Sequence, residues 1–159
     1  MKKVLAILFL GAACSLFAQK YLYTVELTPD NLADIDPRQN VCLKDIGNQK
    51  KAILVLKTDS SWLYLKREFC LGSEIIVSFR YKAAEKGKIA KNIRAVLRYA
   101  KGEVYCEGPA GTPVILPVGM DWKTGKCSMK FPAELEDAMI SFHAKGENIL
   151  VTDIKVHKK

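Results

Sequence analysis

Residues 75–82 alternate between apolar and polar side chains, and they read Ile75-Ile76-Val77-Ser78-Phe79-Arg80-Tyr81-Lys82. Successive side chains of a β-strand point to opposite faces. The odd-numbered residues therefore share one face, which is apolar, and the even-numbered residues share the opposite face, which is mostly polar. Residues 93–99 repeat this pattern, with Arg94 and Arg98 on the polar side. Both stretches therefore predict β-strands with one buried face.

Short segments of the same kind continue through most of the chain. They are residues 21–27, 41–43, 52–56, 62–66, 104–106, 114–116, 128–131, 138–144 and 149–156. Gly, Pro, Asn or Asp lies between nearly all consecutive segments. Regularly spaced short strands with such turns are typical of antiparallel sandwiches and barrels. The length of 159 residues fits one domain. We therefore expect an all-β fold, a single antiparallel β-sandwich of the jelly-roll type over residues 19–159.

The amino terminus has the form of a bacterial signal peptide over residues 1–18. Lys2 and Lys3 precede an apolar run, and small residues follow up to a predicted cleavage after Ala18. The run is shorter than the roughly 20 residues that a membrane-spanning helix needs. We therefore expect a secreted or periplasmic protein whose mature chain has no transmembrane span. The alternative is a lipoprotein anchored at Cys14.

The cysteine count agrees with export. Removal of Cys14 leaves four cysteines, which are Cys42, Cys70, Cys106 and Cys127. An even number in an exported chain predicts up to two disulfides, with three possible pairings. The alternative is that these cysteines are buried free thiols at strand positions. No CxxC spacing is present, so zinc or thioredoxin chemistry is poorly supported.

Three longer stretches, residues 62–83, 119–133 and 138–156, carry a family resemblance. Together they resemble the galactose-binding-like jelly-roll modules of bacterial carbohydrate-binding proteins, of the CenC type. The resemblance covers roughly residues 52–156 and implies a β-sandwich that in many members binds glycans. It also implies a structural calcium between the first and last strands, for which Asp153, Glu26 and Asp30 are the candidate oxygen ligands.

The aromatic residues suggest where a sugar would bind. Trp62 and Tyr64 project from the same face of a predicted strand, next to Lys66. Sugar rings stack their C–H faces on flat aromatic rings, so these three residues are our candidate ligand-binding set. The alternative is that the aromatics are half-buried sandwich residues. In that case the protein is a structural or protein-interaction domain of the cell envelope with no glycan site.

The net charge is +8, and eight basic residues lie between positions 80 and 101. Arg94 and Arg98 share a strand face there, and such a patch attracts an anionic partner. We therefore include both arginines among the ligand-binding candidates and expect the carbohydrate to be neutral or anionic. Export argues against nucleic acid as the partner. The alternative is a solvated hairpin whose lysines protect an edge strand.

Enzyme motifs are absent from the sequence. There is no HExxH, GxSxG or CxxC, and only two histidines occur. Glycosidases need two carboxylates placed across a substrate cleft, which a sandwich of this size seldom builds. We therefore expect a binding protein without catalytic residues.

Overall fold

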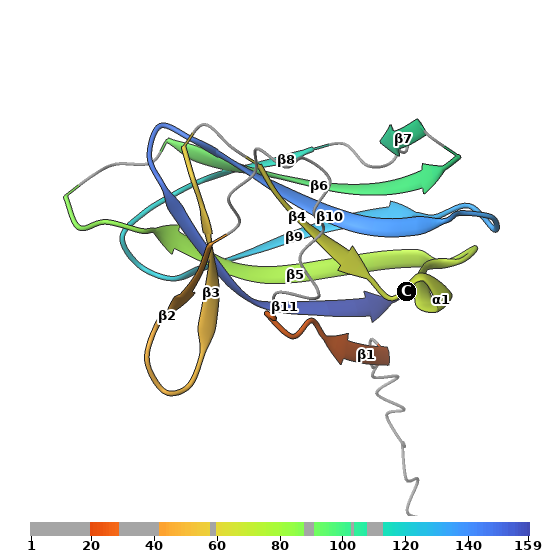
Figure 1. Ribbon diagram of the computed structural model, residues 1–159, viewed down its shortest axis with the longest axis horizontal. Coiled ribbons are helices and arrows are strands. Elements are labelled where there is room, and N and C mark those ends of the chain that lie inside the picture. Colours follow the sequence, from red (N-terminus) through yellow and green to blue (C-terminus); the bar gives the residue numbers. More distant parts are fainter. Residues whose placement is uncertain (1–19, 29–41, 58–59, 88–90, 103, 108–112) are drawn as a thin grey trace, which may run out of the picture.

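The computed structural model describes residues 20–28, 42–57, 60–87, 91–102, 104–107 and 113–159. They form two antiparallel sheets packed face to face, which confirms the predicted β-sandwich (Figure 1). The predicted signal peptide and Cys14 lie outside the described residues. Both stay predictions.

The larger sheet has six strands. In order they are β2 (Cys42–Asp45), β3 (Lys51–Val55), β11 (Ile149–Lys158), β5 (Glu74–Ala83) and β9 (Lys123–Lys130), and β1 (Lys20–Thr24) also pairs with β11. The strand β9 begins five residues earlier than the sequence pattern predicted, because its first half is mostly polar.

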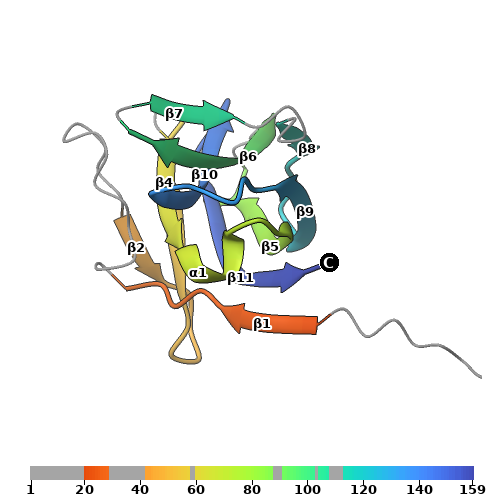
Figure 2. The same cartoon turned by 90° about the vertical axis from the view of Figure 1, so that its right-hand side faces the viewer.

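The smaller sheet has five strands. In order they are β4 (Ser60–Leu65), β10 (Asp137–Lys145), β6 (Asn92–Lys101) and β7 (Val104–Glu107), and β8 (Val114–Pro117) also pairs with β6. A helix that the sequence pattern did not predict, α1 (Arg67–Cys70), joins β4 to β5 at one end of the sandwich (Figure 2). Within the described residues, no helix is long and apolar enough to cross a membrane.

The core lies between the two sheets and contains the predicted apolar face of β5. Val77, Phe79 and Tyr81 are all buried, and the Phe79 ring meets the Phe142 ring of β10 edge to face at 4.9 Å between centroids. Gly125 of β9 is in register with Phe79. A Cβ there would lie 2.6 Å from both Phe79 Cζ and Leu116 Cδ1, so this position has room for glycine alone.

The last strand, β11, carries an irregularity that shapes the surface beside it. Its register with β5 shifts between Thr152 and Lys155, and Asp153 has a φ of 49°, which is unusual for a residue other than glycine. The strand β3 pairs with β11 before the shift, and β1 pairs with it after the shift. The two strands therefore separate beside Asp153, and the segment that follows β1 crosses this gap, where the Val25 amide donates to the Ile154 carbonyl at 2.8 Å.

Candidate functional site

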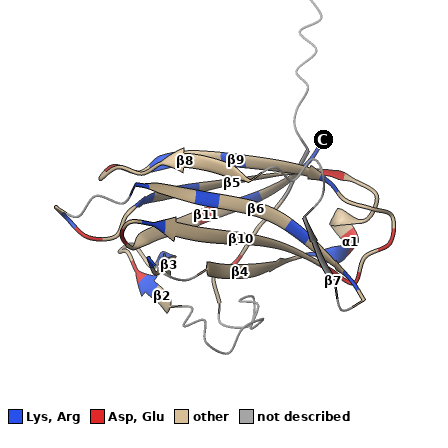
Figure 3. Ribbon diagram, turned by 90° about the horizontal axis from the view of Figure 1, so that it is seen from above, with Lys and Arg blue, Asp and Glu red and all other residues tan. Residues whose placement is uncertain are grey.

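The register of the smaller sheet gathers the predicted ligand-binding residues on one face. Across β4, β10 and β6, Trp62 is opposite Ser141, and Tyr64 is in line with Met139 and Arg98. Paired residues of antiparallel strands point to the same side, and alternate residues of these strands fill the core, so these side chains face outward. Arg94 lies on the same face, and Figure 3 shows the basic positions along β6. We call this surface the outer face of the smaller sheet.

Trp62 is packed into this face instead of standing open on it. Its side chain is only 9% exposed and forms a small cluster with Ala100 and Met139. The guanidinium carbon of Arg98 lies 4.7 Å from the centre of its ring, and its Nε1 donates to Ser60 Oγ at 2.8 Å. Trp62 is therefore not open for stacking as the sugar-binding prediction requires, because the Arg98 side chain from β6 lies over its ring.

The two arginines of the predicted basic patch, Arg94 and Arg98, are only partly exposed to solvent. Arg98 Nε donates to Ser141 Oγ at 3.3 Å. His143 is in register with Arg94 and lies 3.4 Å from Ser141 Oγ through its Nε2. Arg98, Ser141 and His143 thus form a polar network at the centre of the outer face of the smaller sheet, where Ser141 itself is buried.

Tyr64 is 38% exposed and lines a pocket of about 230 Å³ at the edge of β4. We call it the Tyr64 pocket, and its lining residues are Tyr23, Thr24, Val25, Glu26, Tyr64 and Lys66. It therefore joins two of the predicted ligand residues, Tyr64 and Lys66, to Glu26, which the resemblance had assigned to calcium. An aromatic ring, hydroxyl groups and two opposite charges around one hollow suit a sugar ring, which needs a flat apolar surface and polar partners.

Tyr23 lines this pocket, and its side chain is held in place by several contacts. Its hydroxyl accepts a 2.8 Å hydrogen bond from the Lys66 amide, and its ring stacks on Phe69 with 5.4 Å between centroids. The Lys66 ammonium lies 5.1 Å from the centre of the Tyr23 ring. Burial raises the pKa of Tyr23, so the phenol stays neutral. The pocket is therefore held in shape before any ligand arrives, which lowers the entropic cost of binding. The sequence pattern did not single out Tyr23.

A second pocket, of about 310 Å³, is also lined by residues 24–26, and Asp153 is among its other lining residues. The Asp153 carboxylate is 3.4 Å from both Lys50 Nζ and Arg80 Nη1. The described part of the chain contains no group of three His, Cys, Asp or Glu side chains that could hold a metal. Two of the three candidate calcium ligands, Glu26 and Asp153, line this pocket, and the Asp153 carboxylate is paired with two cations. Asp30 lies outside the described residues, and the calcium ion stays a prediction.

Cys42, Cys70 and Cys127 are free thiols, so the expected disulfides do not form among them. The Cys106 side chain lies outside the described residues. Cys42 is exposed on β2, whereas Cys70 in α1 and Cys127 in β9 are buried in the core. These last two agree with the alternative of buried thiols. Burial raises the pKa of Cys70 and of Cys127 to about 12.

Comparisons with known proteins find similarity in structure but not in sequence. No protein-family pattern matches the chain, and no curated protein matches it in sequence. Among solved structures, it is similar to the C-terminal family 22 carbohydrate-binding module of Clostridium thermocellum Xyn10B. That match has a TM-score of 0.61 and 16% identity, and it covers 89% of this chain and 94% of the module.

Two further structures agree. The tandem family 22 domains of Paenibacillus barcinonensis Xyn10C match with a TM-score of 0.64 and 14% identity, covering 87% of this chain and 50% of the tandem. A family 4 module matches with a TM-score of 0.50 and 16% identity, covering 75% of this chain and 78% of that one. The chain therefore has the two-sheet β-sandwich fold of these carbohydrate-binding modules.

Proposed function

We propose that this chain is an exported, non-catalytic module that binds carbohydrate, with the Tyr64 pocket as its main contact. The observation that carries the proposal is the exposed Tyr64 ring, which borders a pocket with a carboxylate, an ammonium group and hydroxyl groups. Among the described residues, the exposed large hydrophobic side chains are Tyr64, Ile115 and Met120, and Tyr64 alone of these is aromatic.

The fold supports the same class of function. Some of the matched family 22 modules are named xylan-binding domains, and another was solved beside a GH10 module with xylohexaose bound. Those descriptions belong to those proteins, and fold alone does not transfer a ligand. They make xylo-oligosaccharides a sensible first probe for this chain.

The lining of the pocket favours binding over catalysis. Glu26 is the one carboxylate among the described residues that line it. Glycoside hydrolysis by the usual route needs two carboxyl groups, about 5–10 Å apart, on either side of the scissile bond. In the binding proposal, the sugar ring stacks on Tyr64, Glu26 accepts hydrogen bonds from its hydroxyls, and Lys66 donates to its oxygens.

A second candidate function is a structural or protein-interaction domain of the cell envelope. Two observations favour it: Trp62 is buried, which removes one of the predicted stacking rings, and Ile115 on β8 is 61% exposed. Ile115 is in register with Arg94 and so belongs to the outer face of the smaller sheet. A protein partner would cover this apolar side chain.

Calorimetric titration with a panel of neutral and acidic oligosaccharides, including xylohexaose, tests the proposal. Tyr64→Ala should weaken binding of the preferred glycan about tenfold, the effect of losing roughly 1 kcal/mol of stacking. Met120→Ala is the matched control, because Met120 is similarly exposed but does not line the pocket. Failure of the wild type to bind any glycan would defeat the proposal and leave the envelope-interaction function.

Export needs its own test. Expression of the full chain in a bacterium, followed by N-terminal sequencing of the product outside the cytoplasm, should find Gln19 as the first residue. A product that begins at an acylated Cys14 would instead support the lipoprotein alternative. An uncleaved chain that stays in the cytoplasm would contradict export.

A further inference from the structure

The outer face of the larger sheet carries a group of exposed lysines that the sugar pocket does not use. Lys126 and Lys130 lie on β9 and point outward, because the residues between and beside them, Cys127 and Met129, are buried in the core. Lys126 and Lys155 of β11 are each in register with Ser78 of β5. We call Lys126, Lys130 and Lys155 the lysine face.

The strand geometry sets the spacing of these charges. Lys126 and Lys155 are two strands apart, which places their backbones about 10 Å from each other, and Lys130 follows Lys126 along β9 by about 14 Å. Serines on β5 and β9, Ser78 and Ser128, lie among them. Hydroxyl groups therefore lie between widely spaced cations on this face.

Acidic side chains do not neutralise this face within the described residues. Glu74 of β5 lies opposite Lys130 on this face, but its carboxylate pairs with Lys159 at 2.9 Å, and Asp153 of β11 pairs with Lys50 and Arg80. The ion pairs found in the described part of the chain include none of the three lysines of the lysine face. Three charges of one sign on one face create a positive potential that attracts anions.

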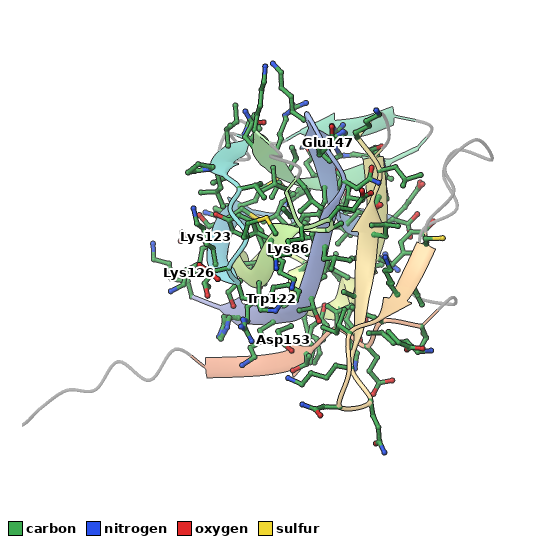
Figure 4. The ribbon with its side chains drawn as sticks, turned by 90° about the vertical axis from the view of Figure 1, so that its left-hand side faces the viewer. Lys86, Trp122, Lys123, Lys126, Glu147 and Asp153 are labelled. Atoms are coloured by element: carbon green, nitrogen blue, oxygen red, sulfur yellow. The ribbon has the colours of Figure 1, made fainter. Side chains whose placement is uncertain are left out.

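The positive surface continues toward Trp122. The Arg80 guanidinium carbon and the Lys82 ammonium lie 5.3 Å and 5.0 Å from the centre of the Trp122 ring. Figure 4 shows Lys123 and Lys126 projecting from the β9 side of the sandwich, above Trp122 and Asp153. Basic side chains therefore continue from the lysine face along β5 and β9 as far as Trp122.

We propose that the lysine face is a second binding site, which takes an anionic polysaccharide bearing carboxylate or sulfate groups. A long polymer with regularly repeated charges can pair with several separated lysines at once, and its hydroxyls can bond to the serines between them. A membrane surface fits less well. Stable binding to lipid needs apolar insertion in addition to charge, and none of the exposed large hydrophobic side chains found among the described residues lies on β5, β9 or β11. The proposal does not rest on the Tyr64 pocket, because that pocket lies at β4, the edge strand of the smaller sheet.

The test compares two triple variants with the same change in net charge. Lys126→Gln/Lys130→Gln/Lys155→Gln removes the lysine face, and Lys44→Gln/Lys57→Gln/Lys91→Gln removes three exposed lysines elsewhere. Affinity for heparin and for polygalacturonate is measured by calorimetry from about 50 to 200 mM salt, since ionic contacts weaken steeply over this range. The first variant should bind both polymers at least about tenfold more weakly and with a shallower salt dependence. The second should stay close to the wild type, and matching thermal melts confirm that both variants are folded.

Several outcomes would overturn the proposal. They are no binding of the wild type to either polymer at low salt, and equal losses in the two triple variants. Tighter lysine-dependent binding to phosphatidylserine vesicles or to single-stranded DNA would assign the face to a different partner. Tyr64→Ala should retain heparin affinity, so the two proposed sites can fail independently.

Discussion

Arg98 of β6 lies over the ring of Trp62 on β4, with its guanidinium carbon 4.7 Å from the ring centre and the whole of β10 between the two strands. A cation over an aromatic face is stabilising, and more so where water is partly excluded. The contact shields the Trp62 ring from solvent. Of the two predicted stacking rings, it leaves Tyr64, two residues further along β4, as the accessible one.

Replacing Arg98 should open the Trp62 ring. In a Trp122→Phe background Trp62 is the single tryptophan, so its fluorescence reports on this contact alone. Arg98→Ala should shift the emission to longer wavelength, increase quenching by acrylamide and lower the free energy of unfolding by about 1 kcal/mol. Arg98→Lys keeps a cation near the ring and is the control. Unchanged quenching in Arg98→Ala would show that another group shields the ring.

Gly125→Ala should destabilise the sandwich. The new methyl group would lie 2.6 Å from Phe79 Cζ, which is in the core and cannot move away freely. Overpacking of this kind typically costs about 1–3 kcal/mol, measured as a fall in the free energy of unfolding by urea. Gly119→Ala is the matched control, because its nearest neighbour is the flexible end of Lys123 at 3.3 Å. Similar losses in the two variants would contradict the packing argument.

The cysteines should differ sharply in reactivity. In a Cys106→Ser chain that begins at Gln19, the exposed Cys42 should react quickly with a thiol reagent at about pH 8. Cys70 and Cys127 should react only on unfolding, because they are buried and hold pKa values of about 12. Cys42→Ser should abolish the fast phase. A fast phase that accounts for more than one thiol would place Cys70 or Cys127 nearer the surface than the structure does.

Alkaline pH should weaken the fold through the same two thiols. Their pKa values rise from 9.0 to about 12 on folding, so the folded state binds more protons than the unfolded state between these values. The free energy of unfolding therefore stays level below about pH 9 and falls as the pH rises toward about 12. Urea titrations at about pH 8 and pH 10 measure the fall. A Cys70→Ala/Cys127→Ala variant should show a smaller pH dependence, and an equal one would assign the effect to other groups.

The amino-acid sequence alone predicts most of the strands and their faces. The alternation at residues 75–82 corresponds to β5, and its odd-numbered side chains are buried as expected. Strand existence follows from local patterning, because each residue's face depends only on its place in the alternation. The first half of β9 does not follow this pattern, since Lys123, Thr124 and Lys126 give it a polar appearance and Gly125 offers no side chain to assign.

The functional surfaces depend on contacts that no local pattern contains. Local sequence was enough to identify a sandwich and to place Trp62 and Tyr64 on one side of a strand. The choice of Tyr64 over Trp62 came from the register of β4, β10 and β6, which brings Arg98 over Trp62. The Tyr64 pocket likewise exists because residues 23–26 pack beside the end of β4. The energies of such long-range contacts depend on how the sheets align, so tertiary structure alone decided which predicted residues meet and which of them reach solvent.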